Sequence, residues 1–168
     1  MVMEDGSVYS FGRDGCGQLG LGRGNLVVSE PKKVHIRSAE KAVRVSAGDA
    51  HVLLATENGK VFSWGDGQQG QLGHGAKADI YVPQEIDRFE KEKIVAVAAG
   101  SSHSGCINED GILYLFGKGR SGQLGRGDQL ESNAANSTSP VKVVGLAGKK
   151  VLQVALGKEH SLTLVEGK

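Results

Sequence analysis

The sequence contains only two cysteines and three prolines among its 168 residues. Cys16 and Cys106 are too few for a disulfide framework, and their spacing is not that of a metal site. A chain without disulfides suits a reducing compartment. We therefore expect an intracellular protein, cytoplasmic or nuclear.

Long apolar runs and an excess of one charge are also missing. No stretch of about 18 apolar residues is present to span a bilayer. The first residues, MVMEDGSVYSFG, lack the basic segment and the following apolar segment of a secretory signal. The net charge is +1, so no overall field draws the chain to nucleic acid. We expect no membrane partner and no strong nucleic-acid partner.

Glycine, in contrast, is abundant, with 26 residues, more than twice its usual share of about 7%. Many of these glycines belong to a repeat. One block centres on Gly-Gln-Leu-Gly, and its first glycines, Gly17, Gly70 and Gly122, are 53 and 52 residues apart. A second block, which carries a Gly-x-x-His turn, follows each copy of the first. The two blocks occupy 8–22, 61–75 and 113–127, and 43–60, 95–112 and 151–168.

Each period of the repeat holds signals for four short strands. The first run is β-branched and aromatic, as VYSF, VFSW or LYLF. A proline opens the second run, at Pro31, Pro83 and Pro140. The third run alternates in polarity, and the fourth follows the histidine. Asn-Gly at 58–59 and Asp-Gly at 110–111 predict two-residue hairpin turns that lead into the next unit.

A period near 50 residues with four short strands is typical of a propeller blade. We predict an all-β fold, a β-propeller of four-stranded antiparallel blades with about three blades. The units run over 7–58, 59–110 and 111–168, and residues 1–6 are the tail of a preceding strand. Three blades do not close a ring, and a blade buries its faces only against neighbours. We therefore expect a partial propeller that further sequence, another chain or a second copy completes.

The stretch VFSWGDGQQGQLGHG at 61–75 also contains Gly-x-Gly-x-x-Gly after a strand, which is the pattern of a dinucleotide-binding turn. That fold needs a helix after the third glycine, then a parallel strand and an acidic residue about 20 residues on. The residues after Gly70 bring two more glycines and a proline, and show no helical period. We interpret the motif as part of the repeat and predict no cofactor.

The motifs VFSWGDGQQGQLGHG and VSAGDAHVLLATENGKVFSWG, with their counterparts, resemble the regulator of chromosome condensation repeat family. The third turn reads LGKEH rather than AGxxH, which is a small departure. The resemblance implies a β-propeller that normally closes with seven blades. It also implies one of two functions: a non-catalytic protein-interaction scaffold, or guanine-nucleotide exchange on a Ran-type small GTPase. In members that exchange nucleotide the AGxxH turns contribute to the GTPase-binding face, and Asp49 in SAGDAH best matches that pattern.

Residues that recur in all three copies are predicted to serve the fold. We expect the leucines to fill the seam between blades and the histidines to be buried and bonded to loop backbone. Three histidines are also enough for a zinc site, but equivalent positions in successive blades need not converge, so we predict no metal. The structural set is Gly17, Gly70, Gly122, Leu19, Leu72, Leu124, His51, His103 and His160.

Residues that differ between the copies are predicted to contact a partner, because loops on a rigid scaffold commonly carry function. The alternative is that they are only solvated loop tips. Their mixed charges favour a protein over a polyanion. No nucleophile has a visible activating base, so we predict no catalytic residue. The predicted contact residues are Asp49, Asp66, Gln68, Gln69, Ser101, Lys118, Arg120, Lys158 and Glu159.

Overall fold

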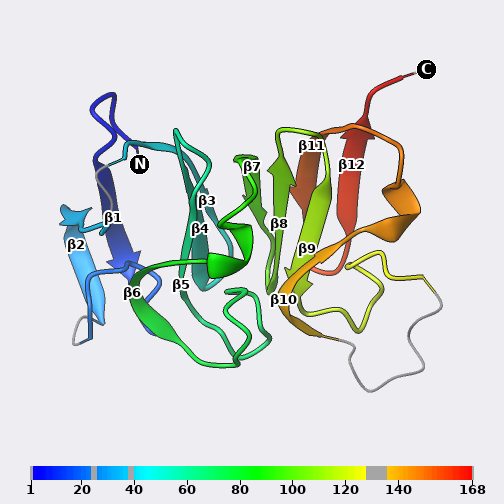
Figure 1. Cartoon of the computed structure of the whole chain (residues 1–168). Helices are drawn as coiled ribbons and strands as arrows, with labels where there is room; N and C mark the ends of the chain where they lie inside the picture. Colours follow the sequence, from blue (N-terminus) through cyan, green and yellow to red (C-terminus); the bar gives the residue numbers. More distant parts are fainter. Residues whose placement is uncertain (1, 24–25, 38–39, 128–135, 168) are drawn as a thin grey trace.

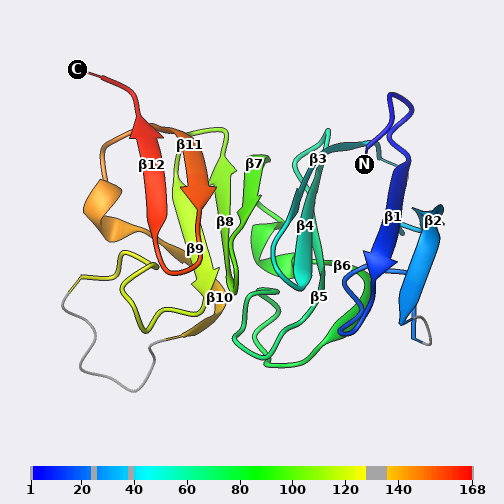
Figure 2. The ribbon, with the colours of Figure 1, turned by 180° about the vertical axis from the view of Figure 1, so that it is seen from behind.

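A computed structural model describes residues 2–23, 26–37, 40–127 and 136–167. Within them, antiparallel strands form two four-stranded and two two-stranded sheets that stand side by side (Figure 1; Figure 2 from behind). This confirms the predicted all-β partial propeller. The strands are β1 (Val8–Arg13), β2 (Val27–Val34), β3 (Ala42–Ala47), β4 (His51–Thr56), β5 (Val61–Gly65), β6 (Ile80–Glu85), β7 (Ile94–Ala99), β8 (His103–Asn108), β9 (Leu113–Gly117), β10 (Ser137–Lys142), β11 (Val151–Leu156) and β12 (Ser161–Val165).

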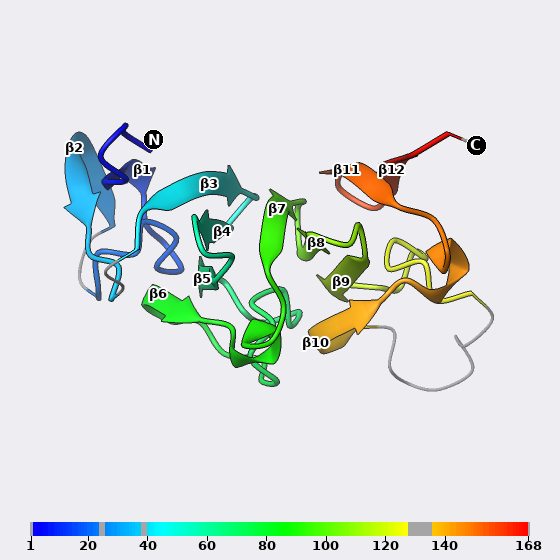
Figure 3. The ribbon, with the colours of Figure 1, turned by 45° about the horizontal axis from the view of Figure 1, so that its top comes forward.

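The two complete blades have the orders β3-β4-β5-β6 and β7-β8-β9-β10. They are flanked by an N-terminal half-blade, β1-β2, and a C-terminal half-blade, β11-β12. Figure 3 shows β3, β7 and β11 along one side of the row, whereas β6 and β10 lie on the other. β7 contacts both β3 and β11. These three strands therefore form the inner edge of an arc, and β6 and β10 form its outer edge.

The sequence units and the blades are out of phase. The predicted unit 7–58 contains β1 and β2 of the N-terminal half-blade, followed by β3 and β4 of the first complete blade. The following unit supplies β5 and β6, which finish that blade. Every complete blade is thus closed by hydrogen bonds between two successive units, as in the β4–β5 pair, where His51 lies opposite Gly65.

Within the described residues the core consists of three apolar clusters, one in each seam between neighbouring sheets. Side chains alternate across β4, so Leu53 belongs to the cluster shared with the second complete blade and Leu54 to the cluster shared with the N-terminal half-blade. Both leucines have no exposed surface. Burial of each such side chain stabilises the fold by roughly 1.5–3 kcal/mol. Each leucine is buried only while the neighbouring sheet that it faces is in place.

The prolines lie inside the outermost strands rather than at their starts. Pro31, Pro83 and Pro140 are within β2, β6 and β10, so the prediction that each proline opens its strand is wrong. An edge strand tolerates proline because its outward amide needs no partner in the sheet. The pairing register shifts in each of these strand pairs.

The turns between the fourth strand of one unit and the first strand of the next, which join β4 to β5 and β8 to β9, hold three residues, not the predicted two. The Thr56 amide donates to the Lys60 carbonyl, and the Gly59 amide donates to the Thr56 carbonyl. Only glycines have positive φ in the described residues, and Gly59 has +87°. A two-residue type I′ turn would need positive φ at Asn58 as well, which explains the longer loop.

Short 3₁₀ segments connect the outer strands to the next inner strand. They are η1 (Asp87–Phe89) and η3 (Val144–Leu146). Phe89 is buried and meets the Tyr114 ring edge-on at 5.3 Å between ring centres. Among the described residues, no helix has the length and apolar character needed to cross a membrane.

Candidate functional site

All nine predicted contact residues lie on one face of the arc. β4 starts where β5 ends, and β8 starts where β9 ends, since His51 pairs with Gly65 and His103 with Gly117. The turns that precede β4 and β8 therefore share a face with the loops that follow β5 and β9. We call this the loop face; its segments are 14–23, 48–50, 66–79, 100–102, 118–127 and 157–160. The opposite face carries the tight turns at 57–59 and 109–111.

The three Gly-x-x-His turns converge on one depression of the loop face, with a volume of about 370 Å³. The Ser101 hydroxyl donates a 2.6 Å hydrogen bond to the Asp49 carboxylate, which links the first turn to the second. The Ser101 amide donates to the Gly157 carbonyl at 3.2 Å, which links the second turn to the third. Lys158 lines the same depression. The structure thus brings Asp49, Ser101 and Lys158 together.

Beside this depression, Lys118 and Glu159 form an ion pair of 2.9 Å. The Lys118 ammonium lowers the pKa of the Glu159 carboxyl through its hydrogen bond and its charge. Both side chains remain partly exposed, so the pair contributes little to stability. Arg120, on the same loop, is exposed. This edge of the loop face therefore offers charges of both signs.

The predicted contact residues in the loop at 66–79 are bonded within the protein. The Asp66 carboxylate accepts hydrogen bonds from the Gln68 amide at 3.0 Å and from the Gln71 side chain at 2.9 Å. The Gln68 side chain donates to Asp79, and the Gln69 side chain accepts from Asn136 at 2.7 Å. Asp66 is half-buried. These residues organise the loop, and only part of their surface is left for a partner.

The repeated histidines join neighbouring sheets. Nε2 of His51 lies 2.9 Å from the hydroxyl of Ser104, and Nε2 of His103 lies 3.1 Å from that of Ser161. The partner is therefore a serine of the next sheet, whereas the sequence suggested loop backbone. His51 and His103 are buried, but His160, in the C-terminal half-blade, is exposed.

Burial shapes the titration of these histidines. It lowers the pKa of His51 to about 4, with a smaller contribution from neighbouring His103. It also lowers the pKa of His103. Nδ1 of each ring is buried without a hydrogen-bond partner. Both histidines are therefore neutral near pH 7.

Among the remaining repeated residues, the leucines lie in the seams. Leu19, Leu72 and Leu124 are buried. The glutamine before each leucine accepts a hydrogen bond from the amide two residues earlier, as in the 2.9 Å bond from the Gln69 amide to Gln71. Gly70 packs so closely on the next blade that a Cβ would lie 2.7 Å from the Ser137 carbonyl oxygen.

The described residues contain no group of three histidine, cysteine or acidic side chains that could hold a metal ion. Burial, with smaller contributions from nearby Asp66 and Asp79, raises the pKa of the Cys16 thiol, which disfavours the reactive thiolate.

Two structural relationships were missed from the sequence. The first is the serine that follows His103 and His160; it recurs in two of three copies, but the first copy has Val52 at that position. The second is the indole of Trp64, which donates a 3.0 Å hydrogen bond to the Gln18 carbonyl. In the other copies a serine hydroxyl donates to the equivalent glutamine carbonyl, as in the 2.7 Å bond from Ser104 to the Gln71 carbonyl.

With this architecture in place, comparison with known proteins defines the class. The chain belongs to the regulator of chromosome condensation repeat family, whose model matches residues 5–55, 58–107 and 110–164. A second model with the same description matches residues 42–71. The chain is therefore a repeat domain of the kind that serves protein interaction and regulation.

Particular relatives differ widely in size. The chain is 38% identical over 165 residues to the E3 ubiquitin-protein ligase HERC2 of Mus musculus, covering 97% of this chain but 3% of the ligase. It is 38% identical over 157 residues to the ultraviolet-B receptor UVR8 of Arabidopsis thaliana, covering 94% of this chain and 34% of the receptor. The structure of Prp20p from Saccharomyces cerevisiae matches with a TM-score of 0.86 at 22% identity, covering 99% of this chain and 41% of Prp20p.

Proposed function

We propose that the loop face docks another protein, and that the depression between the Gly-x-x-His turns is the centre of the contact. The observation that carries this proposal is the convergence of Asp49, Ser101 and Lys158 around one depression. Their backbone positions are equivalent in the repeat, but their side chains differ. A rigid scaffold that presents different side chains at equivalent positions is suited to specific recognition.

The charges of this surface favour a protein partner. Asp49 and Lys158 have opposite signs, and the exposed Lys118–Glu159 pair lies beside them. Mixed charge around a depression matches the polar surface of a folded protein, whereas a nucleic acid needs clustered cations. The hydrogen bond from Ser101 holds the Asp49 carboxylate in place, so less side-chain freedom is lost on binding.

Capture from cell lysate tests the docking surface. The immobilised chain is compared with the double variant Asp49→Ala/Lys158→Ala and with Asp110→Ala, which changes an exposed aspartate on the opposite face. We expect a set of proteins whose capture falls about fivefold or more in the double variant and is unchanged in the control. Capture that is equal for all three proteins, or that depends on Asp110, would contradict the proposal.

A second candidate function is nucleotide exchange on a Ran-type GTPase. The structure that matches with a TM-score of 0.86 belongs to a protein described by its binding to Gsp1p and histones. Exchange requires no nucleophile; the protein must bind the nucleotide-free GTPase more tightly than the loaded form. An exposed carboxylate such as Asp49 would compete with the nucleotide phosphates for the cationic groups of the GTPase.

Release of a fluorescent guanine nucleotide from a Ran-type GTPase tests this second function. We expect the chain to accelerate release, Asp49→Ala to reduce the acceleration about tenfold, and Asp110→Ala to leave it unchanged. An unrelated GTPase is the specificity control. No acceleration by the chain removes exchange as a function and leaves the docking proposal to be decided by the capture experiment.

A further inference from the structure

Hydrogen bonds at the loop face join into a closed ring that crosses the seam between the two complete blades twice. The inner crossing is the 2.6 Å bond from the Ser101 hydroxyl to Oδ2 of Asp49. On the side of the first complete blade, the Asp66 amide donates to the Ala50 carbonyl at 2.8 Å. The turn that carries Asp49 is therefore tied to the loop that follows β5.

The outer crossing is made by Asn136, the residue that precedes β10. Its Nδ2 donates to Oε1 of Gln69 at 2.7 Å, and its Oδ1 accepts from the Gly119 amide at 3.2 Å. The Lys118 amide donates to the Ser102 carbonyl at 2.9 Å. The loop that follows β9 is therefore tied both to the first complete blade and to its own neighbouring turn.

Gln71 closes the ring within the first complete blade. Its Oε1 accepts from the Gln69 amide at 2.9 Å, and its Nε2 donates to Oδ2 of Asp66 at 2.9 Å. Gln71 is buried, and the Ser104 hydroxyl of the next blade donates to its carbonyl. The ring is thus anchored to the buried seam, where Ser104 also meets His51.

The outer crossing is particular to this seam. In the preceding seam, Cys16 and Asp79 occupy the repeat positions of Gln69 and Asn136. The Gly67 amide donates to Oδ1 of Asp79 at 3.1 Å, which is the counterpart of the backbone bond to Asn136. The thiol of Cys16 is a weak hydrogen-bond partner, so it does not replace the amide of Gln69.

We infer that Asn136 is a positioning residue of the docking surface, because it closes the ring that holds Asp49 at the depression. This inference rests on the proposed docking of a protein by the loop face. Asn136 does not line the depression; it acts through Gln69 on one side and through Gly119 on the other.

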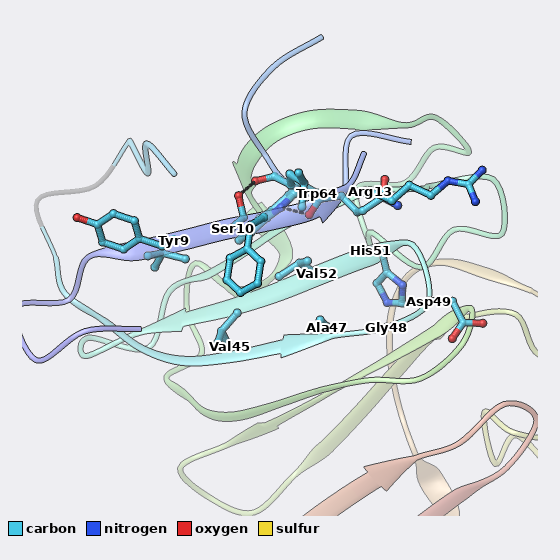
Figure 4. Close-up of a pocket in the computed structure, with 14 residues that line it drawn as sticks. Tyr9, Ser10, Arg13, Val45, Ala47, Gly48, Asp49, His51, Val52 and Trp64 are labelled. Carbon is cyan, nitrogen blue, oxygen red and sulfur yellow. Dashed lines mark hydrogen bonds between the residues drawn. The ribbon is translucent and has the colours of Figure 1, made fainter. Parts of the chain in front are cut away.

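Asp49 is oriented by the ring and still available to a partner. Within the described residues, its printed hydrogen bond engages Oδ2 and leaves Oδ1 open. Figure 4 shows its side chain beyond the His51 ring, pointing away from Val45 and Val52. A carboxylate that is ordered before binding loses less freedom when the partner arrives.

Closure of the ring matters because each member is then held from two sides. Opening it at Asn136 removes the outer of the two crossings, so the loops that carry Asp66 and Lys118 can move apart. Hydrogen bonds in a network also strengthen one another. The loss of one link should therefore be felt at the far side of the ring.

Amide hydrogen exchange of the whole chain tests the ring. Asn136→Asp keeps the acceptor for the Gly119 amide but removes the donor to Gln69, so it opens the outer crossing alone. The diagnostic amide is that of Asp66, in the other blade, and its exchange should become about threefold to tenfold faster. Gln69→Glu adds the same charge at the same contact but keeps the acceptor for Asn136, so exchange at Asp66 should not change.

Capture from cell lysate by the immobilised chain tests the role in docking. Capture of the proteins that depend on Asp49 and Lys158 should fall about threefold or more in Asn136→Asp. Asn58→Asp, the same change at an exposed residue of the opposite face, should leave it unchanged.

Three results overturn the proposal, and they are distinguishable. Unchanged exchange at Asp66 in Asn136→Asp, or an equal rise in Gln69→Glu, refutes the ring. Faster exchange with unchanged capture refutes the positioning role. If no captured protein depends on Asp49, the docking function itself is refuted, whatever the exchange shows.

Discussion

Nε2 of His51 and the hydroxyl of Ser104 lie 2.9 Å apart in the seam between the two complete blades. The same hydroxyl donates to the Gln71 carbonyl at 2.7 Å. Because a hydroxyl has one proton, Nε2 must carry the histidine proton and donate it to Ser104. Nδ1 then carries no proton, and it is buried without a partner. The seam therefore holds a neutral histidine in one tautomer, and this has consequences for stability.

Stability should fall as the pH falls from about 6.5 to about 4. The pKa of His51 is lowered from 6.5 to about 4 by burial, so in this range the unfolded chain binds a proton that the folded chain excludes. The stability from the neutral His51 is fully present above pH 6.5, and the loss of unfolding free energy amounts to about 3 kcal/mol by pH 4. His74 and His103, whose pKa values burial also lowers, act in the same direction.

Urea unfolding across this pH range measures the effect. The difference in unfolding free energy between the unchanged chain and His51→Gln should shrink as the pH falls. His160→Gln, at the exposed equivalent position, should parallel the unchanged chain at every pH. A His51→Gln difference that does not vary with pH would show that His51 is not held neutral.

Removal of the Ser104 hydroxyl should be costly. Ser104→Ala leaves the Nε2 proton of His51 and the Gln71 carbonyl without partners in a buried seam, which costs about 2–4 kcal/mol. Ser161→Ala removes equivalent bonds to His103 and Gln123 at a partly exposed site, where water replaces them, and should cost about 1 kcal/mol or less. Denaturation midpoints of the two variants measure the two losses of stability. Equal losses for Ser104→Ala and Ser161→Ala would contradict the account.

Alanine at Gly70 should destabilise more than alanine at Gly122. The two glycines occupy one repeat position with φ of +85° and +78°, so both variants incur the cost of an alanine at positive φ, about 1–2 kcal/mol. At Gly70 the new Cβ would also lie 2.7 Å from the Ser137 carbonyl oxygen, whereas at Gly122 nothing lies within 4 Å. We expect a further loss of about 1–3 kcal/mol for Gly70→Ala. Thermal unfolding at low protein concentration measures it; similar losses would mean that the blade contact is unimportant.

The fold was largely predictable because its signals are local and recur. A glycine block, an alternating run and a histidine turn, each present three times, indicate four-stranded blades before any contact is known. The positions of Pro31, Pro83 and Pro140 within their strands were not predictable. A proline usually interrupts a sheet, and only the outermost place of these strands, which is a tertiary fact, makes it acceptable.

The site was predictable in outline only. Comparison of the copies selected Asp49, Ser101 and Lys158, and the structure brings them together. The same comparison selected Asp66, whose carboxylate is engaged within its own loop. A residue that varies between copies can be exposed to solvent, or it can form hydrogen bonds within its own loop. Variation alone does not distinguish these cases, because the hydrogen bonds within the loops also differ between copies.

Site-specific photo-crosslinking in cells tests the central claim, that the loop face contacts a protein, most directly. A photoreactive amino acid is placed at position 49 in one protein and at position 110, on the opposite face, in another. The account predicts a discrete crosslinked protein from position 49, lost on Lys158→Ala, and none from position 110. No adduct at position 49, or the same adducts from both positions, would contradict it.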